Sequence, residues 1–534
     1  MRLKQYFNHN VQRKEGYHSM AGYRWFAAAS LVILTAGAAT GGRAQGASTG
    51  VACGSGQPVS VNLLWPTQPN TLDPNYDTLV MFAQISRNMF NGLFKLDDSM
   101  TLQPDLAVSY SQPDALTYEI ELRKDVVFHG GSPFTSADVV ATFDRIVKDQ
   151  KLASKQRSYV SNVKSVTPKG DHAVNFVLKQ PDSSFLKSLA TIIYITPRSV
   201  IEKVGNVEFG KKPVGTGPFK LDSWTMGDSV VLSANCDYHG DKPIPSKVEF
   251  RFIAEPATQI SSLQSGEIDI ATQVTSDLTA ALKSSRDVAV QSIDGNQTFW
   301  LSMNTKEGPF ADPRVRQALN YAIDRTAIAR QLLGGFATPV GQVYSKSVFG
   351  YTKAVSPYPF DPDKAKALLR EAGYDSSRPL KIEFYNFRAE LNPVQQSIAS
   401  FLSDVGIKVT TRFDPNYFVD TWQSGKMGRG QVIIRSNNNL LMDADFALGL
   451  ELDGTRRGMY FSSPETDAAI AKARGESDRN ARQAAYDALN KTLYNLAPVT
   501  FLYSTDGIYG VSTRVDWKPR PDGAIYLANV TKRR

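Results

Sequence analysis

Two serine–lysine pairs are the residues of this chain that come nearest to a catalytic motif. Both have the Ser-x-x-Lys spacing: Ser161 with Lys164, and Ser184 with Lys187. Secreted acyltransferases that use a Ser-x-x-Lys nucleophile also carry a Lys-Thr-Gly element. No Lys-Thr-Gly occurs anywhere in this sequence. Two such spacings are expected by chance in a chain this rich in serine and lysine, so the sequence predicts that the protein is not an enzyme.

Metal and phosphate chemistry also lack the residue spacing that they need. Three histidines follow residue 44, namely His129, His172 and His239, and none stands at ligand spacing from another histidine or a cysteine. The glycine-rich string at residues 215–217 lacks the Lys-Ser/Thr of a phosphate-binding loop. We therefore expect no metal and no cofactor, and a structural role for His129 in a turn.

The charge of the chain gives no indication of a nucleic acid partner. The 534 residues carry a formal net charge of +8. Residues 1–44 hold six Lys or Arg and one Glu, and the remainder holds 54 basic and 51 acidic residues, a net charge of +3. So small an excess is typical of a solvated surface. The length exceeds what one hydrophobic core supports, so two or three lobes are expected.

The first 44 residues have the pattern of a cleaved signal peptide. A basic stretch precedes the uncharged residues 26–40, and Gly42 and Ala44 are small residues at the −3 and −1 positions of a cleavage site. The alternative, a membrane anchor, needs about 20 apolar residues, and this segment is shorter. We expect secretion with cleavage after Ala44, and either Met1 or Met20 is the first residue made.

The chain has two cysteines, Cys53 and Cys236. In an oxidising compartment they are able to pair, and the closed loop is long enough for a stabilising entropy effect. The alternative for Cys53 is a lipid anchor, but residues 50–52 match a lipoprotein signal only loosely. The sequence does not favour lipidation and leaves the disulfide open.

The elements that must position any binding residue alternate between short strands and amphipathic helices, which predicts an α/β fold. Asp312 before Pro313, and Asp361 before Pro362, are typical of a helix N-cap and first helical residue. Gly373 is suited to end the second of these helices. Strands are expected at residues 59–65, 173–178, 230–234, 248–253, 298–304, 381–387, 408–413 and 431–435, and a long helix at 479–496.

The stretch at residues 122–146 (LRKDVVFHGGSPFTSADVVATFDRI) predicts the end of a strand, a turn and a helix. Thr135 stands three residues before Asp138, the spacing of a capping box, and an apolar helical stripe follows. This string closely resembles the signature region of family 5 extracellular solute-binding proteins, the receptors of peptide, opine and nickel ABC importers. Four further segments resemble sequence motifs of this family and occur in the same order along the chain, at residues 212–219, 265–269, 312–328 and 358–374.

The resemblance implies a three-lobe periplasmic-binding-protein fold with mixed sheets flanked by helices. One lobe is expected from residues 58–90, 213–297 and 497–534, an inserted lobe from 91–212, and a further lobe from 298–496. Two chain crossings between the first and last of these lobes are expected to act as hinges. Such a receptor closes over its ligand, which stabilises the closed state, and then docks on a membrane permease. A monomer is expected.

In dipeptide-binding members of this family, an arginine shortly after a strand pairs with the carboxylate of the ligand. Arg388 stands at the matching place in this chain. A guanidinium group presents a planar fork of donors that matches a carboxylate. The alternative is that Arg388 forms a surface ion pair with Glu390.

The same relatives hold the ligand's amino group with an aspartate, and here the sequence departs from them. Counting forward from the strand at 431–435 puts Asn439 at that place, and counting back from Asp443 puts Leu440 there. Both lack a carboxylate, and an unpaired buried charge is costly. An ordinary dipeptide with a free amine is therefore disfavoured.

The polar run Arg435, Asn437, Asn438 and Asn439 suits a ligand rich in hydroxyl, amide or carboxylate groups, or else forms a solvated loop. Trp300 and Tyr417 are candidates for stacking on the ligand, although each fits the core at least as well.

The sequence thus predicts a secreted receptor that passes a peptide-like, opine-like or carboxylate-bearing solute to an ABC permease. One alternative is a nickel-chelate or haem receptor of the same family. Another is a sensory receptor on the same fold, which binds the solute without passing it on.

Overall fold

The structure is a computed structural model, and it describes residues 52–64, 69–456, 458 and 460–534. The expected signal peptide, its cleavage site after Ala44 and both candidate start residues lie outside the described residues. Among the helices in the described ranges, none is long and apolar enough to cross a bilayer.

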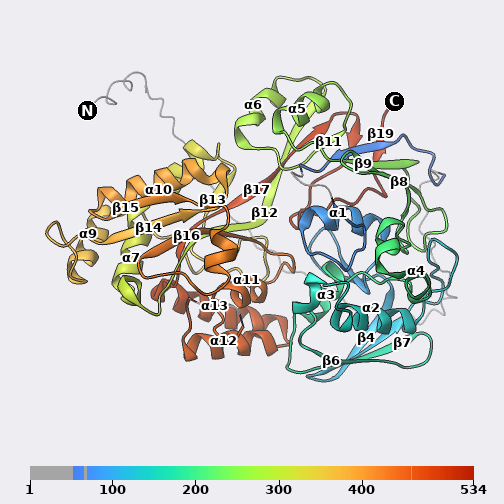
Figure 1. The fold of residues 1–534 in the computed structure, drawn as a ribbon, viewed down its shortest axis with the longest axis horizontal. Helices are drawn as coiled ribbons and strands as arrows, with labels where there is room; N and C mark the ends of the chain where they lie inside the picture. Colours follow the sequence, from blue (N-terminus) through green and yellow to red (C-terminus); the bar gives the residue numbers. More distant parts are fainter. Residues whose placement is uncertain (1–51, 65–68, 457, 459) are drawn as a thin grey trace, which may run out of the picture. The chain divides into compact units, whose positions relative to one another are not determined.

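Most strands belong to one mixed sheet (Figure 1). Its order is β15 (Lys408–Phe413), β14 (Lys381–Asn386), β16 (Gln431–Asn438), β12 (Val288–Met303), β17 (Thr500–Ser512), β11 (Ile270–Ala271), β1 (Val59–Asn62), β10 (Lys247–Arg251), β9 (Ser229–Ala234) and β8 (Phe219–Thr225), with β13 (Ala337–Pro339) beside β17. A second sheet has the order β4 (Ala107–Asp114), β5 (Thr117–Leu122), β7 (Ala173–Leu178) and β6 (Val163–Pro168). Two short pairs are β2 (Phe94–Leu96) with β3 (Leu102–Pro104), and β18 (Val515–Asp516) with β19 (Thr531–Lys532).

Helices follow and precede these strands, so the predicted α/β class is confirmed. They are α1 (Val80–Met89), α2 (Ser136–Lys148), α3 (Phe185–Thr191), α4 (Arg198–Lys211, kinked at Gly205), α5 (Pro256–Gln264), α6 (Thr279–Lys283), α7 (Pro313–Ala322), α8 (Arg325–Ala327), α9 (Pro362–Glu371), α10 (Asn392–Asp404), α11 (Ala444–Glu451), α12 (Pro464–Gly475) and α13 (Arg479–Leu496).

The predicted helix ends are confirmed. The carboxylate of Asp312 accepts from the backbone N–H of Arg314, and that of Asp361 accepts from Lys364. Gly373 follows the last residues of α9 with a φ of +84°, a conformation that glycine adopts without strain. Each cap satisfies backbone groups that a helix end leaves unpaired.

The strand-turn-helix prediction for residues 122–146 is also confirmed. The strand is β5, and α2 begins after the capping box of Thr135 and Asp138. The carboxylate of Asp138 accepts from the backbone N–H of Thr135 at 2.9 Å. Apolar residues of β5, β7 and α2 then share one core, which includes Ile120, Phe143 and Phe176.

One strand is longer than the sequence predicts. β12 begins at Val288, ten residues before the predicted start, and it pairs with β17 along most of its length (Figure 1). Asp294, Gly295 and Asn296 lie at a register shift inside the ladder, between Ile293 and Gln297. A Cβ on Gly295 would lie 2.5 Å from the backbone oxygen of Thr505, so the two chains approach too closely for any side chain. Pairing with β17 therefore continues on both sides of this irregularity and extends the strand beyond its predicted start.

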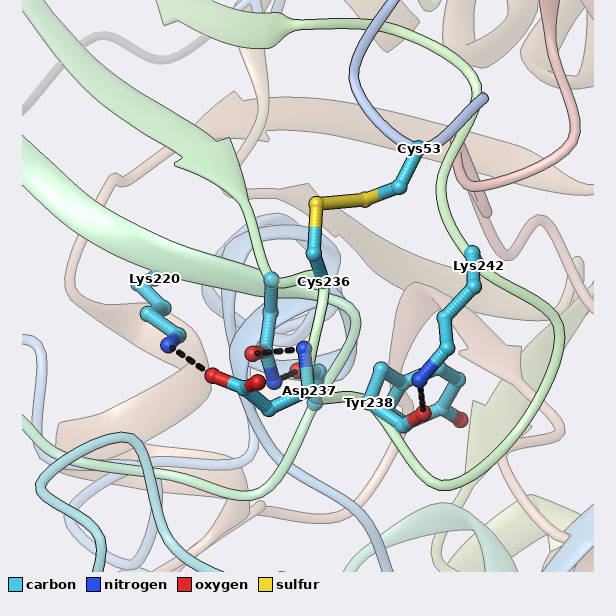
Figure 2. The surroundings of a disulfide bond; sticks show 8 residues. Cys53, Lys220, Cys236, Asp237, Tyr238 and Lys242 are labelled. Atoms are coloured by element: carbon cyan, nitrogen blue, oxygen red, sulfur yellow. Dashed lines mark hydrogen bonds and ion pairs between the residues drawn. A yellow bond between two sulfur atoms is a disulfide. The ribbon is translucent and has the colours of Figure 1, made fainter. Parts of the chain in front are cut away.

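Cys53 and Cys236 form a disulfide (Figure 2). The bond joins residues 183 apart in sequence, and it fixes the start of the described chain beside the end of β9. Because the sulfur of Cys53 is used in this bond, the same atom is not free to carry a lipid. The open question about pairing is therefore answered, and an oxidising compartment fits it.

His129 ties together the turns of two motifs. Its Nδ1 accepts from the backbone N–H of Gly215 at 3.2 Å, and its Nε2 lies 3.1 Å from the carbonyl oxygen of Gly217. These partners select the neutral ring with its proton on Nε2. Burial lowers the pKa of His129 to about 4. The role of this histidine is structural, in agreement with the sequence analysis.

We expect loss of the disulfide to destabilise the protein. The double substitution C53S/C236S removes a long-range cross-link, and the free energy of unfolding should fall by about 2–4 kcal/mol. Chemical denaturation with and without a reductant measures this. The wild type in reductant should match the double variant, whereas equal stability of oxidised and reduced wild type would contradict the prediction.

His129 should contribute to the acid sensitivity of the fold. Below its ordinary pKa of 6.5 the unfolded chain binds a proton, and the folded chain does so only near pH 4. Stability is therefore present above pH 6.5 and is lost as the pH falls toward 4, by about 3 kcal/mol in total. The variant H129Q should be less stable at pH 7.5 but lose less stability between pH 6.5 and 4.5. An unchanged pH dependence of its melting temperature would show that His129 does not titrate in this way.

Candidate functional site

The loop between β16 and α11 closes on itself through Asn439. The side-chain amide of Asn439 donates to the carbonyl oxygen of Asp443 at 2.8 Å, and its oxygen accepts from the N–H of Asp443 at 3.0 Å. Asn439 is 1% exposed. Both functions of its amide are used inside the loop, which makes it a structural clamp rather than a free polar group.

Leu440, the next residue, lines a recess. The recess also includes Val80, Phe82 and Arg87 of the α1 segment, with Ile192 and Tyr194 after α3. It has an empty volume of about 510 Å³ including its mouth, of which about 30 Å³ is open to the centre of a water molecule. Of the two positions counted for the aspartate of dipeptide receptors, Leu440, counted back from Asp443, is the one whose side chain lines this recess, and it is apolar.

Charged groups border the recess as well. Arg87 donates from Nε to the hydroxyl oxygen of Tyr194 at 3.5 Å. Asp522 is held by the guanidinium of Arg520 through two hydrogen bonds of 3.1 and 3.0 Å. Asp77 pairs with Lys155 Nζ at 2.6 Å. Both carboxylates at the recess thus have cationic partners within the fold.

Arg388 lies at the end of β14, where it contacts both its neighbour and β16. Its Nε is 2.7 Å from Glu390 Oε1, and its Nη1 donates to Ser436 Oγ at 3.2 Å. The side chain is about one third exposed. The ion pair that the sequence left as an alternative is therefore present, and the guanidinium also reaches the strand that carries the other predicted residues.

Arg435 and Trp300 face each other across β16 and β12. The Arg435 guanidinium lies 3.9 Å from the ring centre of Trp422 and 4.4 Å from that of Phe418. Its Nε is 3.8 Å from Glu451, and burial lowers the pKa of Arg435 and raises that of Glu451. Trp300 is 1% exposed. This face of the sheet holds an aromatic-enclosed ion pair, not an open polar surface.

The remaining residues predicted to contact the ligand, Asn437, Asn438 and Tyr417, lie in different surroundings. Asn438 is exposed, and Asn437 is half-buried opposite Thr298. Tyr417 stacks on Tyr385 with ring centres 3.8 Å apart, and its hydroxyl donates to Gln431 at 2.8 Å. Burial raises the pKa of Tyr417. Tyr417 thus packs in a small aromatic core, as the alternative interpretation of the sequence has it.

The serine–lysine pairs do not form nucleophile and base. Lys187 Nζ donates to Asp443 Oδ2 at 3.1 Å, whereas the hydroxyl of Ser184 donates to Asp182 at 2.7 Å. Ser161 donates to the carbonyl oxygen of Ser158. In each pair the serine is bonded elsewhere, so the Ser-x-x-Lys spacing has no catalytic geometry here.

Sequence reasoning missed Arg87 and Tyr194. The recess is built from segments around residues 74–87, 156, 191–194, 440 and 522. No spacing rule connects positions so far apart. An arginine on a largely buried helical segment is the signal that was present in the sequence.

Comparisons with known proteins define the class. The fold matches that of periplasmic binding proteins: DppA from Helicobacter pylori in complex with peptide STSA has a TM-score of 0.77 at 24% identity, covering 89% of this chain and 98% of that one. AgaA from A. tumefaciens R10 in complex with agropinic acid has a TM-score of 0.75 at 26% identity, covering 89% and 99%. The periplasmic-binding-protein fold expected from the sequence is thereby confirmed.

The family follows from the sequence. Residues 101–456 match the profile described as bacterial extracellular solute-binding proteins, family 5 Middle. Glutathione-binding protein GsiB of Escherichia coli O1:K1 / APEC is 34% identical over 343 residues, and that of strain K12 is 33% identical. The match covers 63% of this chain and 66% of the relative. The chain belongs to family 5 of the bacterial extracellular solute-binding proteins.

The loop clamp makes a testable prediction. Replacing Asn439 with alanine leaves the buried backbone groups of Asp443 without partners, so N439A should lose about 1–3 kcal/mol of unfolding free energy. The neighbouring variant N438A removes an exposed amide and should change stability by less than about 0.5 kcal/mol. Denaturant titration measures both. A stable N439A that has lost solute binding would instead identify Asn439 as a direct ligand contact.

Proposed function

We propose that this protein is the secreted receptor of an ABC importer and that it captures a small peptide-like, opine-like or carboxylate-bearing solute. The observation that carries the proposal is the recess between Leu440 and Arg87, in a chain of family 5. Its partners are the solute and the membrane permease. Relatives named for glutathione and agropinic acid support this solute class.

The location that fits this role is the periplasm. The disulfide between Cys53 and Cys236 supports an oxidising compartment, and the leader sequence supports export. We propose that the mature protein begins after residue 44 and acts as a monomer.

We also propose the three lobes with the boundaries given above. The long strand β12 includes residues on both sides of the expected crossing at residues 297–298, and it pairs antiparallel with β17, which begins at Thr500, just after the expected crossing at residues 496–497. Paired strands that connect two lobes are suited to act as a hinge, because small changes of backbone angles there rotate one lobe relative to the other.

The departure from the aspartate of dipeptide receptors bears on the solute. Leu440, one of the two positions counted for that aspartate, gives the recess an apolar side chain. We propose that the preferred solute does not depend on a free amine at this point.

A thermal-shift screen of the mature protein tests the function. Glutathione, agropinic acid, the dipeptide Met-Leu and nickel-histidine are suitable probes. A ligand at a thousand times its Kd adds about 4 kcal/mol of stability, which is readily seen as a rise in melting temperature. We expect the largest rise with glutathione or agropinic acid.

Other outcomes would redirect the proposal. A large shift with Met-Leu would contradict the argument from Leu440. A shift with nickel-histidine alone would favour the nickel-chelate receptor. In the described residues no group of three His, Cys, Asp or Glu side chains is arranged to hold a metal ion. Uptake of the best solute by cells with and without this protein separates a transport receptor from a sensory one.

A further inference from the structure

Arg87 is a half-buried cation with one buried donor left over. It lies on α1 and lines the recess, and its Nη1 atom is buried without a hydrogen-bond partner. Its Nε has one long bond, to the hydroxyl of Tyr194. An arginine stays protonated at all physiological pH values. A buried donor without a partner is costly to the fold, so its presence points to a use.

The carboxylates around the recess are bonded to groups other than Arg87, although the charge of Asp522 still stabilises the arginine cation electrostatically. Asp522 is bonded to Arg520 by two hydrogen bonds and also accepts from the N–H of Ala524. Asp77 accepts from Lys155 and from the backbone N–H of Thr78. Neither carboxylate forms a hydrogen bond to Arg87 among the described residues.

Tyr194 adds a second donor. Its hydroxyl oxygen accepts from Arg87, which leaves the hydroxyl proton for another acceptor. Tyr194 is 5% exposed and lines the same recess. A guanidinium N–H and a phenol O–H at one buried point suit an acceptor with two oxygens.

The size and walls of the recess restrict that acceptor. The space open to the centre of a water molecule is about 30 Å³, which is enough for one small group. Val80, Phe82, Ile192 and Leu440 make the walls largely apolar. A carboxylate attached to a carbon chain fits both features, whereas a fully hydrated inorganic anion would lose its water to apolar walls.

We propose that Arg87, with Tyr194, anchors one carboxylate of the solute in this recess, an inference that rests on the proposed receptor function. The anchor is distinct from Arg388, whose Nε is already paired with Glu390. A solute with a carboxylate therefore binds in preference to its amide or ester.

The first test is the affinity of three variants. Isothermal titration with the glutathione or agropinic acid used above should show about 10- to 100-fold weaker binding to R87M, because a charge-assisted bond is lost. R87K keeps the charge without the fork and should fall in between. The matched control, R198M, removes a half-exposed arginine on α4 and should bind like the wild type. Wild-type affinity in R87M would overturn the proposal.

The second test needs no ligand. If Arg87 is kept for binding, R87M removes a buried donor that has no partner, and the melting temperature of the ligand-free protein should stay the same or rise. If Arg87 is structural, the melting temperature should fall by about 2–4 °C or more, and that result would overturn the proposal. When no probe binds the wild type, the proposed solute class fails, and this second test still decides the role of Arg87.

Discussion

The carboxylate of Asp443 is the interaction on which the region around the candidate site depends. It is fully buried, accepts two hydrogen bonds of 2.8 Å from Arg482, and is 3.1 Å from Lys187 Nζ. Burial opposes ionisation of this group, but the two cations outweigh it and lower its pKa. The same carboxylate caps α11 by accepting from the N–H of Asp445. One charge thus joins α3, α11 and α13, and its loss would leave two buried cations unpaired.

Contacts with this network hold the loop that precedes Asp443 in place. Asn439 clamps the backbone of Asp443, and Lys187 also donates to the carbonyl oxygen of Met442. Met442 has a φ of +49°, which is unfavourable for a residue with a Cβ and persists because its surroundings hold it. Leu440 lies between these fixed points and faces the recess. Contacts outside the recess therefore hold the apolar side chain of Leu440 at its wall.

Local chemistry in the sequence predicted much of the fold. Asp312, Asp361 and Thr135 each cap the helix that follows because a side-chain oxygen near a helix start bonds to neighbouring backbone groups in any context. The family resemblance was also sufficient for the class. The early start of β12 was not predictable, since it depends on pairing with β17, a strand much later in the chain, on both sides of a register shift.

The candidate site was less predictable for a related reason. Asn439 has the right residue type for a ligand contact, but its partner is the backbone of its own loop. Arg87 has no distinguishing neighbour in sequence. It stands out only in the structure, where its Nη1 atom is buried without a hydrogen-bond partner. Residue type predicts which chemistry is possible, whereas burial and satisfied hydrogen bonds decide which groups remain available for a solute.

Hydrogen–deuterium exchange of the mature protein, with and without the solute that raises the melting temperature most, tests the central claim directly. A solute held in the recess should slow backbone exchange in three separate segments at once: α1 around residues 80–89, residues 191–194, and the loop at 439–443. Protection confined to other parts of the chain at saturating solute would contradict the account.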